Sequence, residues 1–183
     1  MQEKPELRRK LLALRNAIPA DDKTAFDHRI NDAILAWWQT ARDTTIGVYW
    51  PMRGEPDLHA AYAALRRQGV QLALPVVVDD NAPLKFVLWK ENDTLQDDRY
   101  GARIPPATNP QVWPQVLIIP CVGVNAGRFR LGYGGGFYDR TLEAVPRPRT
   151  VGVSYALGEA EFAADTFDVA LDFLITEQGP YAC

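Results

Sequence analysis

Apolar residues recur at helical spacing in the N-terminal part of the chain. The first set predicts a helix over residues 4–17 and comprises Leu7, Leu11, Leu14 and Ile18. Pro5 suits the first turn of this helix, where its missing N–H would have no partner in any case. The second set predicts a helix over residues 22–39 and comprises Phe26, Ile30, Ile34 and Trp37. The chain is therefore expected to begin with two helices.

From residue 44 onward the pattern changes to short apolar runs rich in β-branched residues. These runs predict strands at 44–50, 71–78, 84–89, 116–120, 150–155 and 171–176. Helices are expected at 58–68, where Asp57 is a candidate N-cap and Gly69 follows the last turn, and at 136–144. Residues 79–83 suit a hairpin turn, whereas 90–114 are rich in Asp, Pro and Asn and predict an irregular excursion.

The order of these elements indicates the fold class. Most of the strands are nearly continuous apolar runs that alternate with helices, which is typical of a mostly parallel sheet covered on both faces. We therefore expect an α/β fold. A chain of 183 residues is long enough for one core, and neither a repeat nor a linker divides it, so we expect a single domain over residues 1–183.

Composition and charge exclude several classes of protein. A chain that is 47% hydrophobic and 23% charged is neither disordered nor collagen-like. Its net charge of −3 gives no reason to expect nucleic acid or an anionic membrane as a partner. Two cysteines, Cys121 and Cys183, and two histidines, His28 and His59, form neither a disulfide framework nor a zinc site. The charged N-terminus, and an apolar run at 116–124 of half a membrane span, predict a cytoplasmic protein.

The segment RLGYGGGFYDR, residues 130–140, carries the most chemical information. Four glycines stand at positions 132, 134, 135 and 136, between a predicted strand and a predicted helix. Such a loop exposes backbone N–H groups that bind phosphate, and Arg130 and Arg140 add charged donors. Asp139 is an oxygen ligand suited to Mg²⁺ beside a nucleotide. The segment matches neither a Walker A motif nor GxGxxG, and a glycine-rich turn without a ligand is the alternative.

One basic and one acidic segment elsewhere in the chain are candidates to complete the site that the glycine segment begins. Lys4 and Arg8 are four residues apart, hence on one face of the first helix, where they would reach a triphosphate or simply face solvent. Glu55 and Asp57 follow the strand at 44–50, at the sheet edge where α/β proteins bind ligands, although Asp57 has capping as its alternative role.

Aromatic and acidic residues add two weaker signals. Met52 and Trp50 flank the turn that contains Glu55, and they are candidates either to pack on an aromatic ligand or to belong to the core. The same two roles are open to three aromatic residues of the glycine segment, Tyr133, Phe137 and Tyr138. Asp168 and Asp172, four residues apart before the last strand, are candidates to join Asp139 around a metal, or else capping or surface residues. No partner constellation suggests a catalytic histidine.

At these residues the sequence resembles the 5-formyltetrahydrofolate cyclo-ligase family. The segment 130–140 is its specific signature, supported by Lys4 with Arg8, residues 49–57, and Phe167 and Asp168 with Asp172; order and spacing match from about residue 4 to 176. The resemblance implies a three-layer α/β/α sandwich similar to sugar-phosphate isomerase and CoA-transferase folds. It also implies that ATP and 5-formyltetrahydrofolate react, with Mg²⁺, to give 5,10-methenyltetrahydrofolate, ADP and phosphate.

The resemblance further implies roles for individual residues. The expected ATP-binding residues are Lys4, Pro5, Glu6, Leu7 and Arg8, together with Arg130, Leu131, Gly132, Tyr133, Gly134, Gly135, Gly136, Phe137 and Tyr138. The expected folate-binding residues are Met52, Glu55, Asp57, Tyr133, Gly134, Gly135, Gly136 and Phe137. Arg130, Arg140 and Glu55 are the expected catalytic residues, and Asp139 and Asp168 the expected Mg²⁺ ligands. We expect a monomer.

Two positions depart from the family pattern. Phe137 stands where Tyr is common, and Leu58 replaces a frequent Thr, which leaves open whether Glu55 or Asp57 contacts the pterin. The chemistry itself suits these residues, since phosphoryl transfer requires positioning and charge neutralisation rather than a nucleophilic side chain. The alternatives are an ATP-independent sugar-phosphate or acyl-CoA enzyme on a similar fold, and a non-catalytic folate- or nucleotide-binding module.

Overall fold

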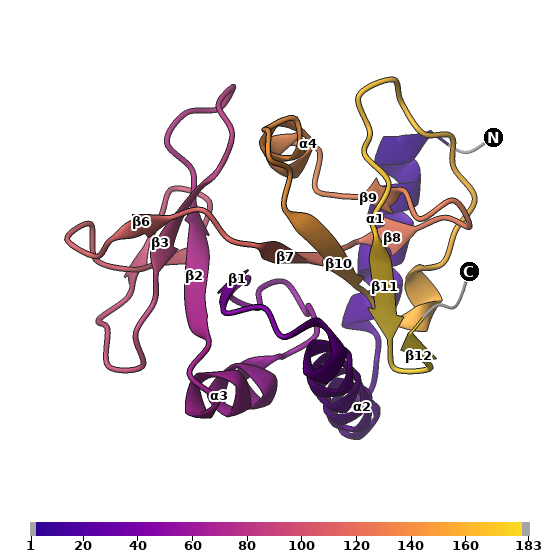
Figure 1. The fold of residues 1–183 in the computed structure, drawn as a ribbon. Helices are drawn as coiled ribbons and strands as arrows, with labels where there is room; N and C mark the ends of the chain where they lie inside the picture. Colours follow the sequence, from indigo (N-terminus) through magenta and orange to yellow (C-terminus); the bar gives the residue numbers. More distant parts are fainter. Residues whose placement is uncertain (1–2, 181–183) are drawn as a thin grey trace.

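A computed structural model describes residues 3–180 and contains a central sheet of eight strands in the order β12-β11-β10-β7-β1-β2-β3-β6 (Figure 1). The five strands from β11 to β2 run parallel, and β12 at one edge and β3 and β6 at the other end of the sheet are antiparallel to their neighbours. The strands are β1 (Thr45–Gly47), β2 (Gln71–Val76), β3 (Lys85–Leu88), β6 (Gln111–Val112), β7 (Val116–Pro120), β10 (Arg149–Val153), β11 (Phe173–Thr176) and β12 (Gly179–Pro180). The expected mostly parallel sheet is confirmed.

The helices also lie close to where the sequence predicts them. They are α1 (Lys4–Asn16), α2 (Ala20–Ala41), α3 (His59–Arg67) and α4 (Phe137–Leu142), with a 3-10 turn η1 (Ala156–Gly158). The strand expected at 44–50 is shorter than predicted: β1 ends at Gly47, the N–H of Val48 still donates to the carbonyl oxygen of Ala73 of β2, and the chain then turns toward Glu55. The irregular region 90–114 contains β6 and a small ribbon of β4 (Gln96–Asp97) and β5 (Arg103–Ile104).

The sheet is covered on both faces, as expected for an α/β/α sandwich. Helices α2 and α3 lie on one face and α4 on the other (Figure 1). Successive residues of β7 alternate between the two cores: Ile118 packs with Ile34 of α2, whereas Leu117 belongs to the cluster that contains Leu142 of α4. A parallel strand buried on both faces requires apolar residues at every position, which explains the unbroken apolar run at 116–120.

Helix α1 packs outside these layers against a small hairpin. Leu7 and Leu11 are buried with Val122, Leu131 and Phe162. The hairpin consists of β8 (Gly123–Val124) and β9 (Arg130–Leu131), whose two-residue strands are too short to leave a periodic signal in the sequence. This packing brings the N-terminal helix next to the glycine segment.

The strand order creates a crevice between β1 and β7. From β1 the chain continues to β2 on one side, and from β7 it continues to β10 on the other side, so connections diverge at this pair of neighbours. In open α/β sheets, ligands bind outside the carboxyl ends of the strands at such a switch point. None of the helices formed by residues 3–180 combines the length and hydrophobicity that crossing a membrane requires.

Candidate active site

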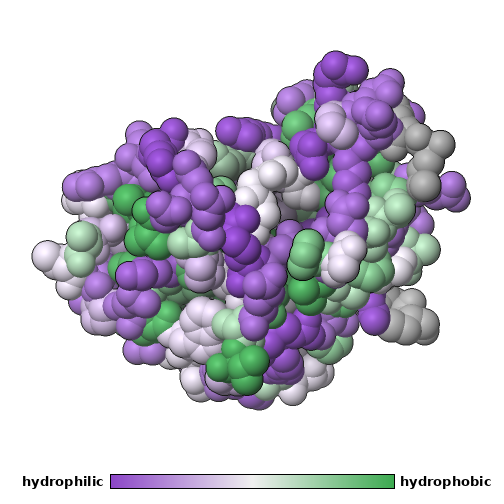
Figure 2. Space-filling view, turned by 90° about the horizontal axis from the view of Figure 1, so that it is seen from above, coloured by the Kyte–Doolittle hydropathy of each residue, from purple (hydrophilic) through white to green (hydrophobic). Residues whose placement is uncertain are grey.

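A cleft of about 1000 Å³ opens at the carboxyl ends of β1, β2 and β7. Its floor includes Tyr49 and Trp50 after β1, Pro75 of β2 and Pro120 of β7. The whole glycine segment 130–140 lines it, as do side chains of α1 and of the loop before β11. The face seen in Figure 2 is hollowed, and hydrophilic residues gather around the hollow. The cleft therefore lies at the switch point of the sheet.

Helix α1 contributes two cations to the cleft. Lys4 and Arg8 both line it, one helical turn apart. Nε of Arg8 donates to the carbonyl oxygen of Gly132 at 2.6 Å, and Nζ of Lys4 donates to Asp165 and Asp168 at 2.6 and 2.9 Å. The residues between them are not part of its lining: Pro5 and Glu6 are exposed, and Leu7 is buried in the core beneath α1. The helix thus brings two of the five predicted residues to the cleft.

The glycine segment takes the conformation that its composition permits. Gly134 and Gly136 have φ of +98° and +66°, which glycine adopts without steric cost. A Cβ at Gly134 would stand 3.7 Å from the Arg8 guanidinium, so the backbone lies close to this cation. In the part of the chain that the structure describes, the N–H groups of Gly134, Gly135 and Gly136 donate to no protein acceptor. They form a set of donors beside Arg8.

The two arginines that bracket this segment have different surroundings. Arg130 is 8% exposed, and its Nη2 donates to Oδ1 of Asp139 at 2.5 Å, whereas its buried Nη1 has no partner among the described residues. Arg140 donates through Nη2 to the carbonyl oxygens of Asp80 and Gly135, both at 2.8 Å. Arg140 therefore ties the glycine segment to the turn between β2 and β3, while Arg130 keeps one free donor.

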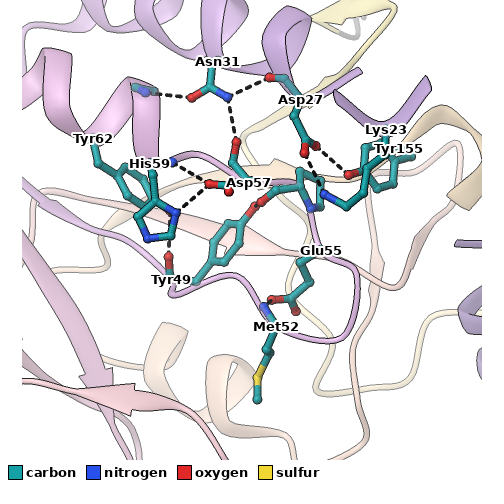
Figure 3. Close-up of polar contacts among 12 residues, drawn as sticks. Lys23, Asp27, Asn31, Tyr49, Met52, Glu55, Asp57, His59, Tyr62 and Tyr155 are labelled. Carbon is teal, nitrogen blue, oxygen red and sulfur yellow. Dashed lines mark hydrogen bonds and ion pairs between the residues drawn. The ribbon is translucent and has the colours of Figure 1, made fainter. Parts of the chain in front are cut away.

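Glu55 is a buried carboxylate in the cleft. It is 3% exposed; Oε1 accepts the hydroxyl of Tyr133 at 2.7 Å, and Oε2 accepts the backbone N–H of Met52 at 2.9 Å, a contact drawn in Figure 3. The Tyr133 oxygen accepts in turn from Nη2 of Arg15 at 2.6 Å. Burial raises the pKa of Glu55 above its ordinary value, against the opposing effect of these hydrogen bonds and of the Arg15 and Arg53 charges.

Asp57, the second acid of this turn, is held away from the cleft. It is not among the residues that line it, and its Oδ1 accepts from the backbone N–H and the Nδ1 of His59 (Figure 3). The hydrogen bond from His59 holds the pKa of Asp57 at about 2. Asn31 of α2 bridges the backbone carbonyl of Asp57 and the N–H of Ala61. The structure thus separates the two acids: Glu55 faces the cleft, and Asp57 supports the start of α3.

The candidate metal ligands are likewise divided. Asp139 and Asp168 line the cleft, and one oxygen of each accepts from Arg130 and Lys4 respectively. Asp172 does not line it; its carboxylate accepts from the N–H and hydroxyl of Thr150 and pairs with Arg147. Residues 3–180 contain no group of three or more His, Cys, Asp or Glu side chains arranged to hold a metal ion. Asp139 and Asp168 are therefore the two predicted ligands that reach the cleft, each paired with a cation of the protein.

The sequence patterns do not single out Arg53 and Tyr100, which line the cleft, or Arg15, which donates to the hydroxyl of the cleft residue Tyr133. Arg15 is 5% exposed and lies eleven residues after Lys4, a spacing that puts both on one helix face and is a usable signal. Arg53 stacks its guanidinium 5.0 Å from the centroid of the Tyr133 ring, and Tyr100 packs its ring on Phe137 at 5.7 Å. No local pattern marks Arg53 or Tyr100, since each reaches the cleft from a loop.

Comparison with known proteins gives one consistent result. A model of the 5-formyltetrahydrofolate cyclo-ligase family matches residues 1–177. The chain is similar to 5-formyltetrahydrofolate cyclo-ligases of Mycoplasma pneumoniae, 26% identical over 96% of this chain and 99% of that protein, and of Mycolicibacterium smegmatis, 29% identical over 96% and 94%. The solved 5,10-methenyltetrahydrofolate synthetase of Mycoplasma pneumoniae superposes with a TM-score of 0.78 at 26% identity, over 96% of this chain and 99% of that one. That of Aquifex aeolicus gives 0.83 at 24% identity, over 97% and 91%.

Proposed function

The chain belongs to the 5-formyltetrahydrofolate cyclo-ligase family, and we propose that it performs the reaction of this family in the cleft at the switch point. It converts 5-formyltetrahydrofolate and ATP to 5,10-methenyltetrahydrofolate, ADP and phosphate. One observation supports the assignment to this cleft. The same cavity is lined by a glycine loop beside two cations of helix α1, and by a buried carboxylate among aromatic rings. Such a cavity suits a polyphosphate and a flat heterocycle side by side.

We propose that the ATP phosphates bind between α1 and the glycine segment. Lys4, Arg8 and the free Nη1 of Arg130 supply charged donors, and the N–H groups of 134–136 supply neutral ones. Helix α4 has only six residues, so the glycine N–H groups and the cations, rather than its dipole, provide the attraction. Asp165 and Asp168, which pair with Lys4, would share it with a phosphate.

The folate is proposed to lie toward Trp50, Met52 and Glu55. An ionised carboxylate accepts hydrogen bonds from the N–H groups of a pterin, and the rings of Trp50 and Tyr133 offer flat apolar surface. Asp57, held by His59, supports the turn from outside. Phe137 packs on Tyr100 and, lacking a hydroxyl, offers only apolar contact.

The reaction follows from bringing the two substrates together. The formyl group is amide-like, so its oxygen is a poor leaving group until the γ-phosphoryl group of ATP is transferred to it, with ADP released. N10 then attacks the formyl carbon, loses its proton, and the C–O bond breaks to release phosphate. The protein contributes mainly in-line positioning and neutralisation of charge on the transferring group, for which Arg130, Arg8 and Lys4 are suited.

We propose that Asp139 and Asp168 hold Mg²⁺ together with the ATP phosphates. The ion would neutralise phosphate charge when bound. Arg140 is proposed to act by fixing the glycine segment, because its guanidinium is bound to backbone carbonyls. A single domain over residues 1–183, a monomer and a cytoplasmic location remain predictions from the sequence.

The proposed function is tested by mixing the purified protein with 5-formyltetrahydrofolate and Mg·ATP while following the absorbance of methenyltetrahydrofolate and the release of ADP. We expect both products in equal amounts, no turnover without ATP, and a large loss of rate in Asp139→Asn. Turnover without nucleotide would instead support an isomerase or acyl-CoA enzyme. Binding of both ligands without ADP release would support a binding module.

A further inference from the structure

A chain of polar groups, buried at both of its ends, joins three distant segments of sequence beside the cleft. Nη2 of Arg15, from the last turn of α1, donates to the hydroxyl oxygen of Tyr133 at 2.6 Å, and this hydroxyl contacts Oε1 of Glu55 at 2.7 Å. Arg15 is 5% and Glu55 3% exposed. Nη1 of Arg15 also contacts the carbonyl oxygen of Cys121, at the end of β7. These groups are called the Arg15 relay below; Arg15 and Glu55 are shielded from water, and the half-buried Tyr133 between them lines the cleft.

The order of donors in the Arg15 relay is determined by chemistry. A guanidinium only donates, so Tyr133 must accept from Arg15 through its oxygen. Its single O–H proton is then free for one acceptor, which is the Glu55 carboxylate. An ionised Glu55 accepts with both oxygens, from Tyr133 and from the Met52 N–H, whereas protonation of either oxygen would weaken it as an acceptor. The Arg15 relay therefore favours a charged carboxylate in a buried place, where burial by itself favours the neutral acid.

Resting on the proposed function, we propose that Arg15 is a positioning residue for folate binding: through Tyr133 it holds the Glu55 carboxylate ionised and oriented toward the substrate. Arg15 itself does not have to touch either substrate. Glu55 has its other oxygen on the Met52 N–H, so the two hydrogen bonds together fix the plane of the carboxylate. Loss of Arg15 would leave the hydroxyl free to rotate and the carboxylate without its nearest cation on α1.

Other charged and titratable groups also act on Glu55. They are Arg53 on the same turn, Tyr49 before it, Tyr62 of α3, Tyr138 of α4 and Cys121 after β7. Arg53 is the remaining cation of this set, and its guanidinium stacks on the Tyr133 ring rather than bonding to its hydroxyl. Removal of Arg15 is therefore expected to raise the pKa of Glu55 rather than to be fully compensated.

The test compares Arg15→Gln with the wild-type protein over a pH series. Two quantities are measured, kcat/KM for 5-formyltetrahydrofolate at saturating Mg·ATP, and the Kd of the folate alone from quenching of tryptophan fluorescence. We expect Arg15→Gln to raise the KM and Kd for the folate about tenfold and to leave the KM for ATP within about twofold. The acidic limb of both pH profiles should move upward by about one unit.

Matched variants separate positioning from a structural effect. Arg9→Gln removes the same charge from an exposed position of α1 and should change neither profile. Tyr133→Phe keeps the ring and breaks the relay, and should shift the profiles as Arg15→Gln does; Arg15→Lys, which keeps the charge, should restore part of the loss. In a Glu55→Gln background, Arg15→Gln should add less than about twofold, because both changes act through one carboxylate.

The outcomes distinguish this inference from the proposed function. Unshifted pH profiles, equal effects on the KM for ATP and folate, or additive effects of Arg15→Gln and Glu55→Gln would overturn the positioning role. A wild-type protein that binds the folate without turning it over would defeat the proposed function, while the Kd series would still decide the inference. Absence of folate binding would overturn both. If Arg15→Gln folds poorly, Tyr133→Phe decides by the same measurements.

Discussion

Nζ of Lys4 lies 2.9 Å from Oδ2 of Asp168, so the first turn of α1 meets the loop before β11 across 164 residues of sequence. The same amine also contacts Asp165, which is largely exposed. Burial lowers the pKa of Lys4, but the hydrogen bonds to these two carboxylates outweigh it and raise the pKa overall. Lys4 therefore stays charged at neutral pH and is shared between the protein and, as proposed, a phosphate.

Lys4→Gln is expected to raise the KM for ATP about tenfold while changing the KM for the folate little, because a charged hydrogen bond to phosphate is lost. Steady-state kinetics with each substrate varied in turn measures both constants. Lys10→Gln, at an exposed position on the same helix, serves as the control for loss of charge. Equal effects of the two substitutions on the KM for ATP would show that the total positive charge of α1, rather than a direct contact from Lys4, attracts ATP.

Gly134→Ala is expected to raise the KM for ATP about tenfold, since the methyl group would contact the Arg8 guanidinium where the phosphates are proposed to bind, and φ of +98° strains any other residue. Gly69→Ala provides the matched control. Gly69 has φ of +82° and nothing within 4 Å of its added Cβ, and it follows α3 away from the cleft. Both variants should lose about 1 kcal/mol of stability, but only Gly134→Ala should affect ATP.

Asp139→Asn and Asp168→Asn are expected to raise, about tenfold or more, the Mg²⁺ concentration that gives half-maximal rate, because each removes one carboxylate from the proposed ion site. A magnesium titration at constant ATP measures this directly. Asp172→Asn is the comparison: its carboxylate binds Thr150 and Arg147, so it should lower stability and leave the magnesium requirement alone. A higher Mg²⁺ concentration for half-maximal rate in Asp172→Asn would instead indicate that Asp172 is a ligand of the ion.

Asp57→Asn is expected to cost about 0.5–1 kcal/mol of unfolding free energy at pH 7, a modest value because the side chain is 54% exposed. The pKa of Asp57 is lowered to about 2, so its charge stabilises the fold above the ordinary carboxylate pKa, and this contribution disappears as pH falls through that lower value. Urea unfolding at pH 7, 4 and 3 should show the difference from wild type shrinking with acidity. A rise in the KM for folate would contradict the structural role.

Local sequence determined the elements and much of the candidate site. The run at 116–120 predicts its strand because both faces of β7 are buried. The spacing of Lys4 and Arg8 predicts their common face because a helix repeats every 3.6 residues, and clustered glycines at 132–136 predict a loop that approaches ligands closely. The strand, the helix face and the glycine loop each depend on residues that are close in sequence, so each can be predicted from one segment alone.

Only the tertiary structure decided which of two similar acidic residues in one segment reaches the cleft. Glu55 and Asp57 are both acids on one turn, yet Asp57 accepts from His59 at 2.6 Å while Glu55 meets Tyr133, 78 residues away. Asp168 reaches the cleft, whereas Asp172, four residues later, pairs with Thr150 at the other end of the strands. Such contacts join segments that are remote along the chain. Their geometry depends on how helices and sheet pack together, and periodicity within a single segment carries no record of it.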